Sequence, residues 1–136
     1  MDSPAGNWVD SRWQHRPWTQ PGGPPDVRIQ VSLANTRILR ALGGEKPLRL
    51  AGDNVVADID LCEANMPVGQ RLQLGQAAIE ISEVYNDACG KFAARYGQAA
   101  VNWIRQPAHR HLRLRGVFAA VVKPGWVTCW DRLYKG

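Results

Sequence analysis

The side chain best suited to chemistry in this chain is the thiol of Cys89, which lies where a strand pattern changes to a helical one. Residues 77–84 alternate apolar and polar positions, and a helical pattern then runs through Tyr96. The positive end of a helix dipole and the ammonium group of Lys91 both favour a thiolate over a thiol. A thiolate can ligate a metal, carry sulfur or act as a nucleophile. The alternative is a buried free cysteine that packs as a small apolar side chain.

Two short polar segments accompany this thiol. Asn86 and Asp87 come just before Cys89, and Asp87 has the residue type of a helix N-cap. Much earlier, residues 52–54 read Gly-Asp-Asn and predict a turn. Because Asp and Asn in turns commonly hydrogen-bond their own backbone, both segments have a purely structural interpretation beside a functional one.

Basic residues gather in one stretch late in the chain. They are Arg105, His109, Arg110, His111, Arg113 and Arg115. A strand over residues 111–122 would place His111, Arg113 and Arg115 on one face, either as a solvated basic surface or as an anion site lined by guanidinium groups. The net charge of +5 permits a nucleic acid, a phosphate-bearing cofactor or another anion as partner, and requires none of them.

Composition places the chain among soluble globular proteins. Its 136 residues suffice for one domain with a core, and no apolar run approaches a membrane span. No secretory signal is evident, and the widely spaced Cys62, Cys89 and Cys129 match neither a disulfide framework nor a zinc pattern. We therefore expect a cytoplasmic protein with no membrane partner.

The elements that must position these residues are predicted from apolar periodicity. Strands are expected over residues 27–33, 55–59, 71–74, 77–84, 111–122 and 126–130, and helices over residues 34–42, 87–96 and 98–104. Residues 1–26 are rich in Trp and Pro and predict irregular chain, whose Trp8, Trp13 and Trp18 pack on the domain or cover a pocket. Residues 27–136 then form the domain. With no βαβ alternation, the fold class is mainly β with short helices, a small and mostly antiparallel barrel.

In their order and spacing, several segments resemble the MOSC domain, the C-terminal domain of molybdenum-cofactor sulfurases. The resemblance covers residues 27–131 and rests on Gly-Asp-Asn-Val-Val (52–56), Met-Pro-Val-Gly-Gln-Arg-Leu-Gln-Leu-Gly-Gln-Ala (66–77), Ile-Glu-Ile-Ser (79–82), Asp-Ala-Cys-Gly-Lys-Phe (87–92), Tyr-Gly (96–97) and Arg-Gly-Val-Phe-Ala (115–119). It implies a barrel-like core in which Cys89 carries sulfur as a persulfide or ligates the molybdenum of a pyranopterin cofactor.

The resemblance also implies which residues surround this cysteine. The expected cofactor-binding residues are Asn54, Asn86, Asp87, Lys91, Arg113 and Arg115. Among these, Asn54 would line the pocket, and charge suggests that Arg113 and Arg115 face the pyranopterin phosphate. The implied partners are the cofactor or a small-molecule substrate, and a sulfur-donor or redox partner protein. The implied activity is a molybdenum-dependent oxidoreductase or a sulfur carrier.

The chain also departs from the family pattern. A glycine-rich HGG-type segment is not evident, and the family's Val-Gly-Asp appears as Cys-Trp-Asp at residues 129–131. The additional barrel domain of the reductases and the pyridoxal-phosphate domain of the sulfurases have no counterpart in this sequence, so we expect a stand-alone domain. Two alternatives stay open: a non-catalytic basic module that binds nucleic acid or another anion, and a domain that retains only the fold.

Overall fold

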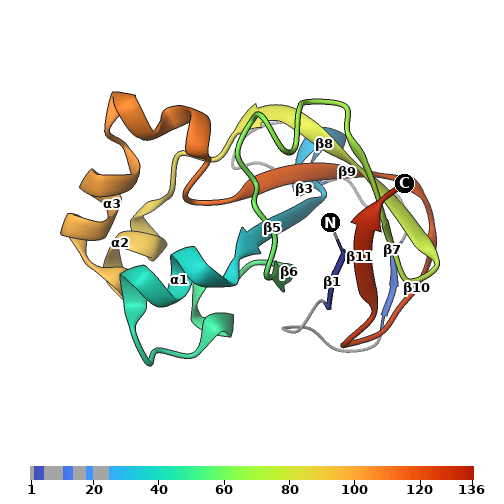
Figure 1. Ribbon diagram of the computed structural model, residues 1–136, viewed down its shortest axis with the longest axis horizontal. Helices are drawn as coiled ribbons and strands as arrows, with labels where there is room; N and C mark the ends of the chain where they lie inside the picture. Colours follow the sequence, from blue (N-terminus) through green and yellow to red (C-terminus); the bar gives the residue numbers. More distant parts are fainter. Residues whose placement is uncertain (1, 5–10, 14–17, 20–24) are drawn as a thin grey trace.

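The computed structural model describes residues 2–4, 11–13, 18–19 and 25–136. Seven strands of these residues form one sheet in the order β1-β11-β7-β8-β9-β5-β6. They are β1 (Asp2–Pro4), β5 (Val31–Asn35), β6 (Val55–Ala57), β7 (Arg71–Leu74), β8 (Ala77–Tyr85), β9 (Val117–Lys123) and β11 (Arg132–Lys135). All neighbours are antiparallel except β5 and β6. The sheet curls into a nearly closed barrel (Figure 1), so the predicted fold class is confirmed.

Shorter elements complete the described part of the chain. Strand β2 (Ser11–Trp13) pairs with β10 (Gly125–Val127), and β3 (Trp18–Thr19) pairs with β4 (Pro25–Asp26). The helices are α1 (Thr36–Gly43), α2 (Gly90–Tyr96) and α3 (Gln98–Ile104), with 3-10 turns η1 (Val27–Ile29), η2 (Leu48–Ala51) and η3 (Pro107–Leu112). Among the described residues, no helix is long and apolar enough to cross a membrane.

The barrel interior is filled by side chains that alternate along its strands. Leu72, Leu74, Ala77 and Ile79 of the β7–β8 hairpin are fully buried, while Gln73 and Ala78 between them are only half-buried. A two-residue turn at 75–76 joins the strands and sets Leu74 opposite Ala77, as the alternation predicted. Each fully buried Leu or Ile contributes about 1.5–3 kcal/mol to stability relative to an exposed one.

A second apolar cluster holds the helices against one end of the barrel. Leu39 of α1, Phe92 of α2, and Val101 and Ile104 of α3 are buried together with Val56 of β6. The three helices lie together at one end of the barrel, where β5 leads directly into α1 (Figure 1). Because β6 contributes to both clusters, the position of the helices relative to the barrel is determined by shared packing.

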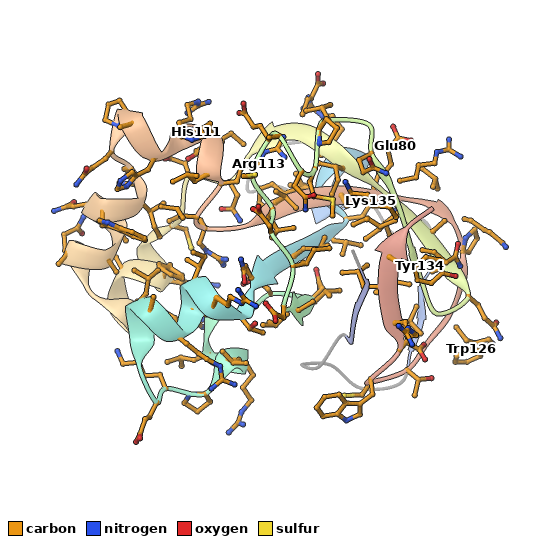
Figure 2. All side chains as sticks on the ribbon, in the orientation of Figure 1. Glu80, His111, Arg113, Trp126, Tyr134 and Lys135 are labelled. Carbon is orange, nitrogen blue, oxygen red and sulfur yellow. The ribbon has the colours of Figure 1, made fainter. Side chains whose placement is uncertain are left out.

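The predicted strand over residues 111–122 is wrong in its first half. Residues 107–112 form η3, and β9 begins only at Val117. Pro107 begins the 3-10 turn, and Gly116 adopts φ +114, with its backbone so close to Leu33 that a Cβ would lie 2.1 Å from the Leu33 carbonyl oxygen. The shared basic face of His111, Arg113 and Arg115 is therefore not formed, and Arg113 is buried whereas His111 is exposed (Figure 2).

Other predicted elements also have different bounds: the helix expected over residues 34–42 spans Thr36–Gly43, and the strand expected over residues 55–59 ends at Ala57. Residues 27–29 form η1, so the strand expected over residues 27–33 begins at Val31. The predicted helix over residues 87–96 begins at Gly90. The predicted closing strand 126–130 ends at Val127 as β10; a turn in which Trp130 has φ +76 follows, and the last strand, β11, lies beyond the predicted range. The large side chains of Trp126 and Tyr134 are exposed on these two strands (Figure 2).

The leader predicted over residues 1–26 falls largely outside the described residues. Its described pieces are extended: β1 pairs with β11 and β2 pairs with β10, so both are joined to the domain by backbone hydrogen bonds. Trp8 lies outside the described residues, and only the backbone of Trp13 and Trp18 is described, so the packing and lid hypotheses for these tryptophans stay predictions.

Candidate functional site

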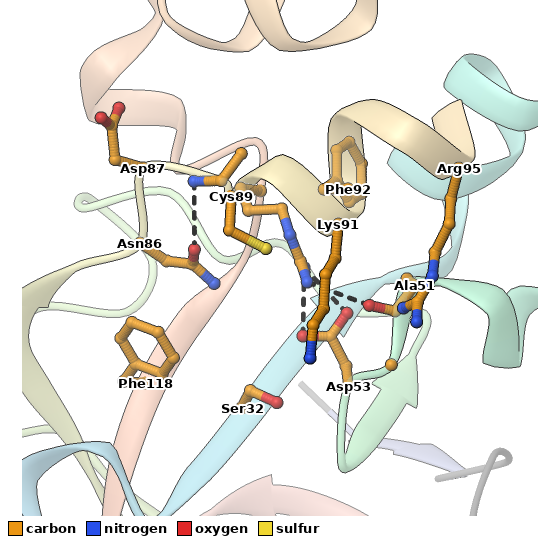
Figure 3. Close-up of a pocket in the computed structure, with 13 residues that line it drawn as sticks. Ser32, Ala51, Asp53, Asn86, Asp87, Cys89, Lys91, Phe92, Arg95 and Phe118 are labelled. Atoms are coloured by element: carbon orange, nitrogen blue, oxygen red, sulfur yellow. Dashed lines mark hydrogen bonds and ion pairs between the residues drawn. The ribbon is translucent and has the colours of Figure 1, made fainter. Parts of the chain in front are cut away.

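A pocket of about 610 Å³ opens between the sheet and helix α2 (Figure 3). Strands β5 and β9 contribute one wall, the turn after η2 a second, and the segment between β8 and α2 a third. The lining residues are Ser32, Ala51, Gly52, Asp53, Asn86, Asp87, Ala88, Cys89, Lys91, Phe92, Arg95, Arg115 and Phe118. Residues from four separate stretches of the chain, at positions 32, 51–53, 86–95 and 115–118, thus meet around one cavity.

Cys89 enters this pocket through an unusual backbone turn. Strand β8 ends at Tyr85, and Ala88 then adopts the left-handed conformation, with φ 63. The next residue, Cys89, is extended and occupies the N-cap position of α2. Its side chain is exposed, so the alternative of a buried packing cysteine is wrong. Left-handed backbone at a non-glycine residue costs on the order of 1 kcal/mol and is concentrated at functional sites.

Arg105 holds the segment that carries the thiol. Its Nε donates to the Asp87 carbonyl oxygen at 3.0 Å and its Nη2 to the Ala88 carbonyl oxygen at 3.3 Å. The same guanidinium lies 3.6 Å from the Asp87 carboxylate. On the other side, the Ala88 amide donates to Asn86 Oδ1 at 3.3 Å. Asn86 and Asp87 therefore shape the turn before Cys89, and both also line the pocket.

The surroundings of Cys89 favour the thiolate. The backbone N–H of Phe92 lowers the pKa of the Cys89 thiol most, and the backbone N–H of Lys91 adds to this. The charges of Arg115 and Lys91 lower that pKa further, while partial burial opposes them. The Cys89 side chain forms no capping hydrogen bond with α2. The helix amides thus act on the ionised sulfur, as expected for a thiol at a helix N-terminus.

The floor of the pocket contains a buried ion pair. Arg115 Nη1 donates to both carboxylate oxygens of Asp53, at 3.0 and 2.8 Å, and Nη2 donates to the Ala51 carbonyl oxygen at 3.2 Å. The two side chains are 9% and 0% exposed. The Arg115 guanidinium carbon also lies 4.7 Å from the ring centroid of Phe92. Burial raises the pKa of Asp53 above its usual range, and the Arg115 charge opposes that shift.

The structure brings together most, but not all, of the predicted site. Asn86, Asp87, Cys89, Lys91 and Arg115 line the pocket, whereas Asn54 and Arg113 do not. The Asn54 Oδ1 accepts from the Ser32 amide at 2.9 Å, so Asn54 supports a lining residue. Arg113 donates to the carbonyl oxygens of Leu61 and Met66 and lines a separate, smaller cavity. Neither side chain is among the residues that line the pocket.

Sequence reasoning missed several lining residues. Asp53 belongs to the Gly-Asp-Asn turn predicted from the sequence. Its ion pair with Arg115 joins residues 62 positions apart, and no local sequence pattern indicates such a pair. Arg95 could have been found, because it follows Lys91 by four positions and therefore shares its helix face. Phe92 and Phe118, the two phenylalanines of the lining, stand at apolar positions of their predicted helix and strand. The sequence cannot distinguish such positions from ordinary core positions.

Fold and pocket together define a small β-barrel protein with an accessible, thiolate-favouring cysteine at the start of a helix. Comparisons with models of known families and with curated proteins give no match. Among solved structures, YiiM from Escherichia coli is similar over 100% of this chain and 70% of its own, with TM-score 0.73 and 15% identity. YiiM from Geobacillus stearothermophilus covers 98% and 75% of the two chains, with TM-score 0.65 and 13% identity.

A third similar structure is YuaD from Bacillus subtilis, which covers 98% of this chain and 84% of its own with TM-score 0.52 and 21% identity. YiiM and YuaD are MOSC-domain proteins. The chain thus has a MOSC-like fold.

Proposed function

We propose that this protein is a MOSC-like domain in which the Cys89 thiolate ligates the molybdenum of a pyranopterin cofactor bound in the pocket. The observation that carries the proposal is the position of this sulfur: exposed, with a lowered pKa, on the wall of a cavity of about 610 Å³. Cavities of this size accept small-molecule ligands and cofactors.

A single protein thiolate, that of Cys89, fits a cofactor that already carries most of the ligands of its metal. A thiolate is a soft donor suited to a metal that also binds sulfur. The described residues contain no group of three or more His, Cys, Asp or Glu side chains that could hold a metal ion by themselves. One protein thiolate completing the coordination of a sulfur-bearing cofactor agrees with that donor set. When bound, the cofactor supplies two-electron redox chemistry.

The residues of this chain prepare the pocket for such a ligand. The helix amides, Arg115 and Lys91 lower the pKa of the Cys89 thiol and so favour the ionised sulfur, the form that binds metal. The half-buried Phe118 offers an apolar ring surface to a planar ring system. The ion pair between Asp53 and Arg115 keeps the floor rigid, since both groups are buried and hydrogen-bonded to each other.

Metal analysis of the protein purified from a molybdenum-replete host tests this proposal. We expect molybdenum in the wild type and in a Cys62→Ser control, because Cys62 does not line the pocket. Cys89→Ser is expected to remove the metal. Molybdenum retained by Cys89→Ser at the wild-type ratio would overturn the ligand role.

A second candidate function, sulfur transfer, is favoured by the exposure of Cys89. The Cys89 thiolate would attack the terminal sulfur of a donor persulfide. A new S–S bond forms on Cys89, the donor's S–S bond breaks, and the donor leaves as a thiolate, while the proton stays on the transferred sulfur. The test is incubation with a small persulfide and mass analysis of the peptides. A gain of one sulfur atom at Cys89, and not at Cys62 or Cys129, is expected; equal labelling of all three contradicts it.

A further inference from the structure

The cations that line the pocket differ in how their charges are compensated. Arg115 is paired with Asp53 inside the protein. The other lining carboxylate, Asp87, faces Arg105. Among the described residues, no carboxylate forms an ion pair with Lys91 or Arg95, although both line the pocket. The pocket therefore presents two uncompensated positive charges on one wall.

These two charges lie close together on α2, and that of Lys91 is unfavourably placed relative to the helix dipole. Lys91 lies in the first turn, at the positive end of the helix dipole, and that turn has no acidic residue. Arg95 is four positions later, so the two like charges are neighbours on the same helix face and repel each other. Figure 3 shows both side chains extending from α2 toward the turn at residues 51–53. A bound anion would remove both penalties at once.

Arg95 is also held in place for a ligand. Its Nη1 donates to the Leu50 carbonyl oxygen at 3.1 Å, which anchors one corner of the guanidinium. The group lies against Gly52, where a Cβ would be 3.3 Å from Arg95 Nη1. Only one of its five N–H donors is used within the described residues, so the others can bind oxygen atoms of an anion.

We propose that Lys91 and Arg95 form an anion subsite that binds the phosphate group of a ligand whose other end reaches Cys89. Arg95 supplies forked donors and Lys91 a point charge, a combination suited to a phosphate dianion. The subsite lies along α2 from the sulfur. This subsite proposal depends on the proposed function in one respect: the same ligand must also reach the Cys89 thiol. It assigns the phosphate to Lys91 and Arg95 in place of Arg113 and Arg115, whose charges are used within the protein.

The test compares two alkylating reagents of similar size, anionic iodoacetate and neutral iodoacetamide, at low ionic strength. The rate of each at Cys89 is followed by peptide mass spectrometry, and the ratio of the two rates is formed. Both reagents need the thiolate, so the ratio cancels any change in its population and reports the local charge. We expect the Lys91→Gln/Arg95→Gln double variant to reduce the iodoacetate-to-iodoacetamide ratio by about tenfold, the effect of removing on the order of 1.4 kcal/mol of attraction.

Matched controls separate the subsite from general charge. Lys123→Gln removes an exposed charge at the end of β9, outside the pocket lining, and is expected to leave the ratio unchanged. Arg95→Lys keeps the positive charge, and its iodoacetate-to-iodoacetamide ratio is expected to stay close to the wild-type value. Inorganic phosphate should slow the iodoacetate reaction of the wild type more than sodium chloride at equal ionic strength does, and should lose this effect in the double variant.

Two results would overturn the subsite: a ratio unaffected by the double variant, or phosphate protection that is equal in the wild type and the double variant. Circular dichroism establishes that each variant is folded before its rates are compared. The outcome is separable from the proposed function. Bound molybdenum without charge selectivity contradicts the subsite alone, and charge selectivity without molybdenum contradicts the cofactor proposal alone.

Discussion

Arg115 reaches across 62 positions of sequence to bind Asp53 with one nitrogen shared between both carboxylate oxygens, at 3.0 and 2.8 Å. The pair joins the loop before β9 to the turn before β6 in the pocket floor. Its members have almost no exposed side-chain surface. The same guanidinium lowers the pKa of the Cys89 thiol. One buried contact therefore ties the stability of the fold to the reactivity of the site.

Replacing Asp53 by Asn is expected to destabilise the protein strongly. The change leaves the buried Arg115 charge without a counterion, and breaking a buried pair in this way costs about 3–5 kcal/mol. Urea denaturation measures the loss of unfolding free energy. Glu83→Gln is the control, since its pair with Arg28 is exposed and such pairs contribute about 0–1 kcal/mol. Equal losses in the two variants would contradict the prediction.

The reactivity of Cys89 is expected to rise with pH and to level off below the ordinary cysteine pKa of about 8.5. The folded protein lowers the pKa of this thiol, so it favours the thiolate relative to the unfolded chain. The associated stability is present above the ordinary value and is lost as pH falls through the lowered one. Iodoacetamide rates across pH measure the inflection, with the urea-unfolded chain as reference. The same inflection in both states would show that the fold does not act on this sulfur.

Replacing Gly116 by Ala is expected to destabilise the fold by more than about 1 kcal/mol. The residue has φ +114, and the added Cβ would overlap the Leu33 carbonyl oxygen, which belongs to the neighbouring strand β5. Gly90→Ala is the matched control, because a Cβ there meets nothing within 4 Å. Thermal denaturation of both variants checks this, and a harmless Gly116→Ala would disprove the close approach.

Replacing Arg113 by Gln is expected to weaken folding without changing ligand recognition. The buried side chain donates to the carbonyl oxygens of Leu61 and Met66, and leaving buried acceptors unpaired costs about 1–3 kcal/mol. The iodoacetate-to-iodoacetamide ratio at Cys89 should stay at the wild-type value. A reduced ratio with unaltered urea stability would instead return Arg113 to the role that its charge predicted.

Local patterns were enough to predict the hairpin and the place of the thiol. In β7 and β8, alternating apolar residues and a glycine turn are properties of adjacent residues, so they predict the pairing of Leu74 with Ala77. The change of period around Cys89 is equally local, and α2 begins at Gly90, the residue after Cys89, although its predicted start was three residues earlier. Apolar periodicity and turn preference depend on residues only a few positions apart, so the sequence alone is enough to predict their effects.

Only the tertiary structure decided what the basic residues do. The alternation of Leu112 and Leu114 with arginines imitates a strand, but η3 and the left-handed backbone of Arg113 break it. Arg115 is thereby turned toward Asp53, and Arg113 toward carbonyl groups. These partners come from distant segments, and the contacts depend on how β5, β6 and the helices pack. Thus the sequence by itself determined a barrel with a thiol at a helix start, while packing decided which cations stay available beside it.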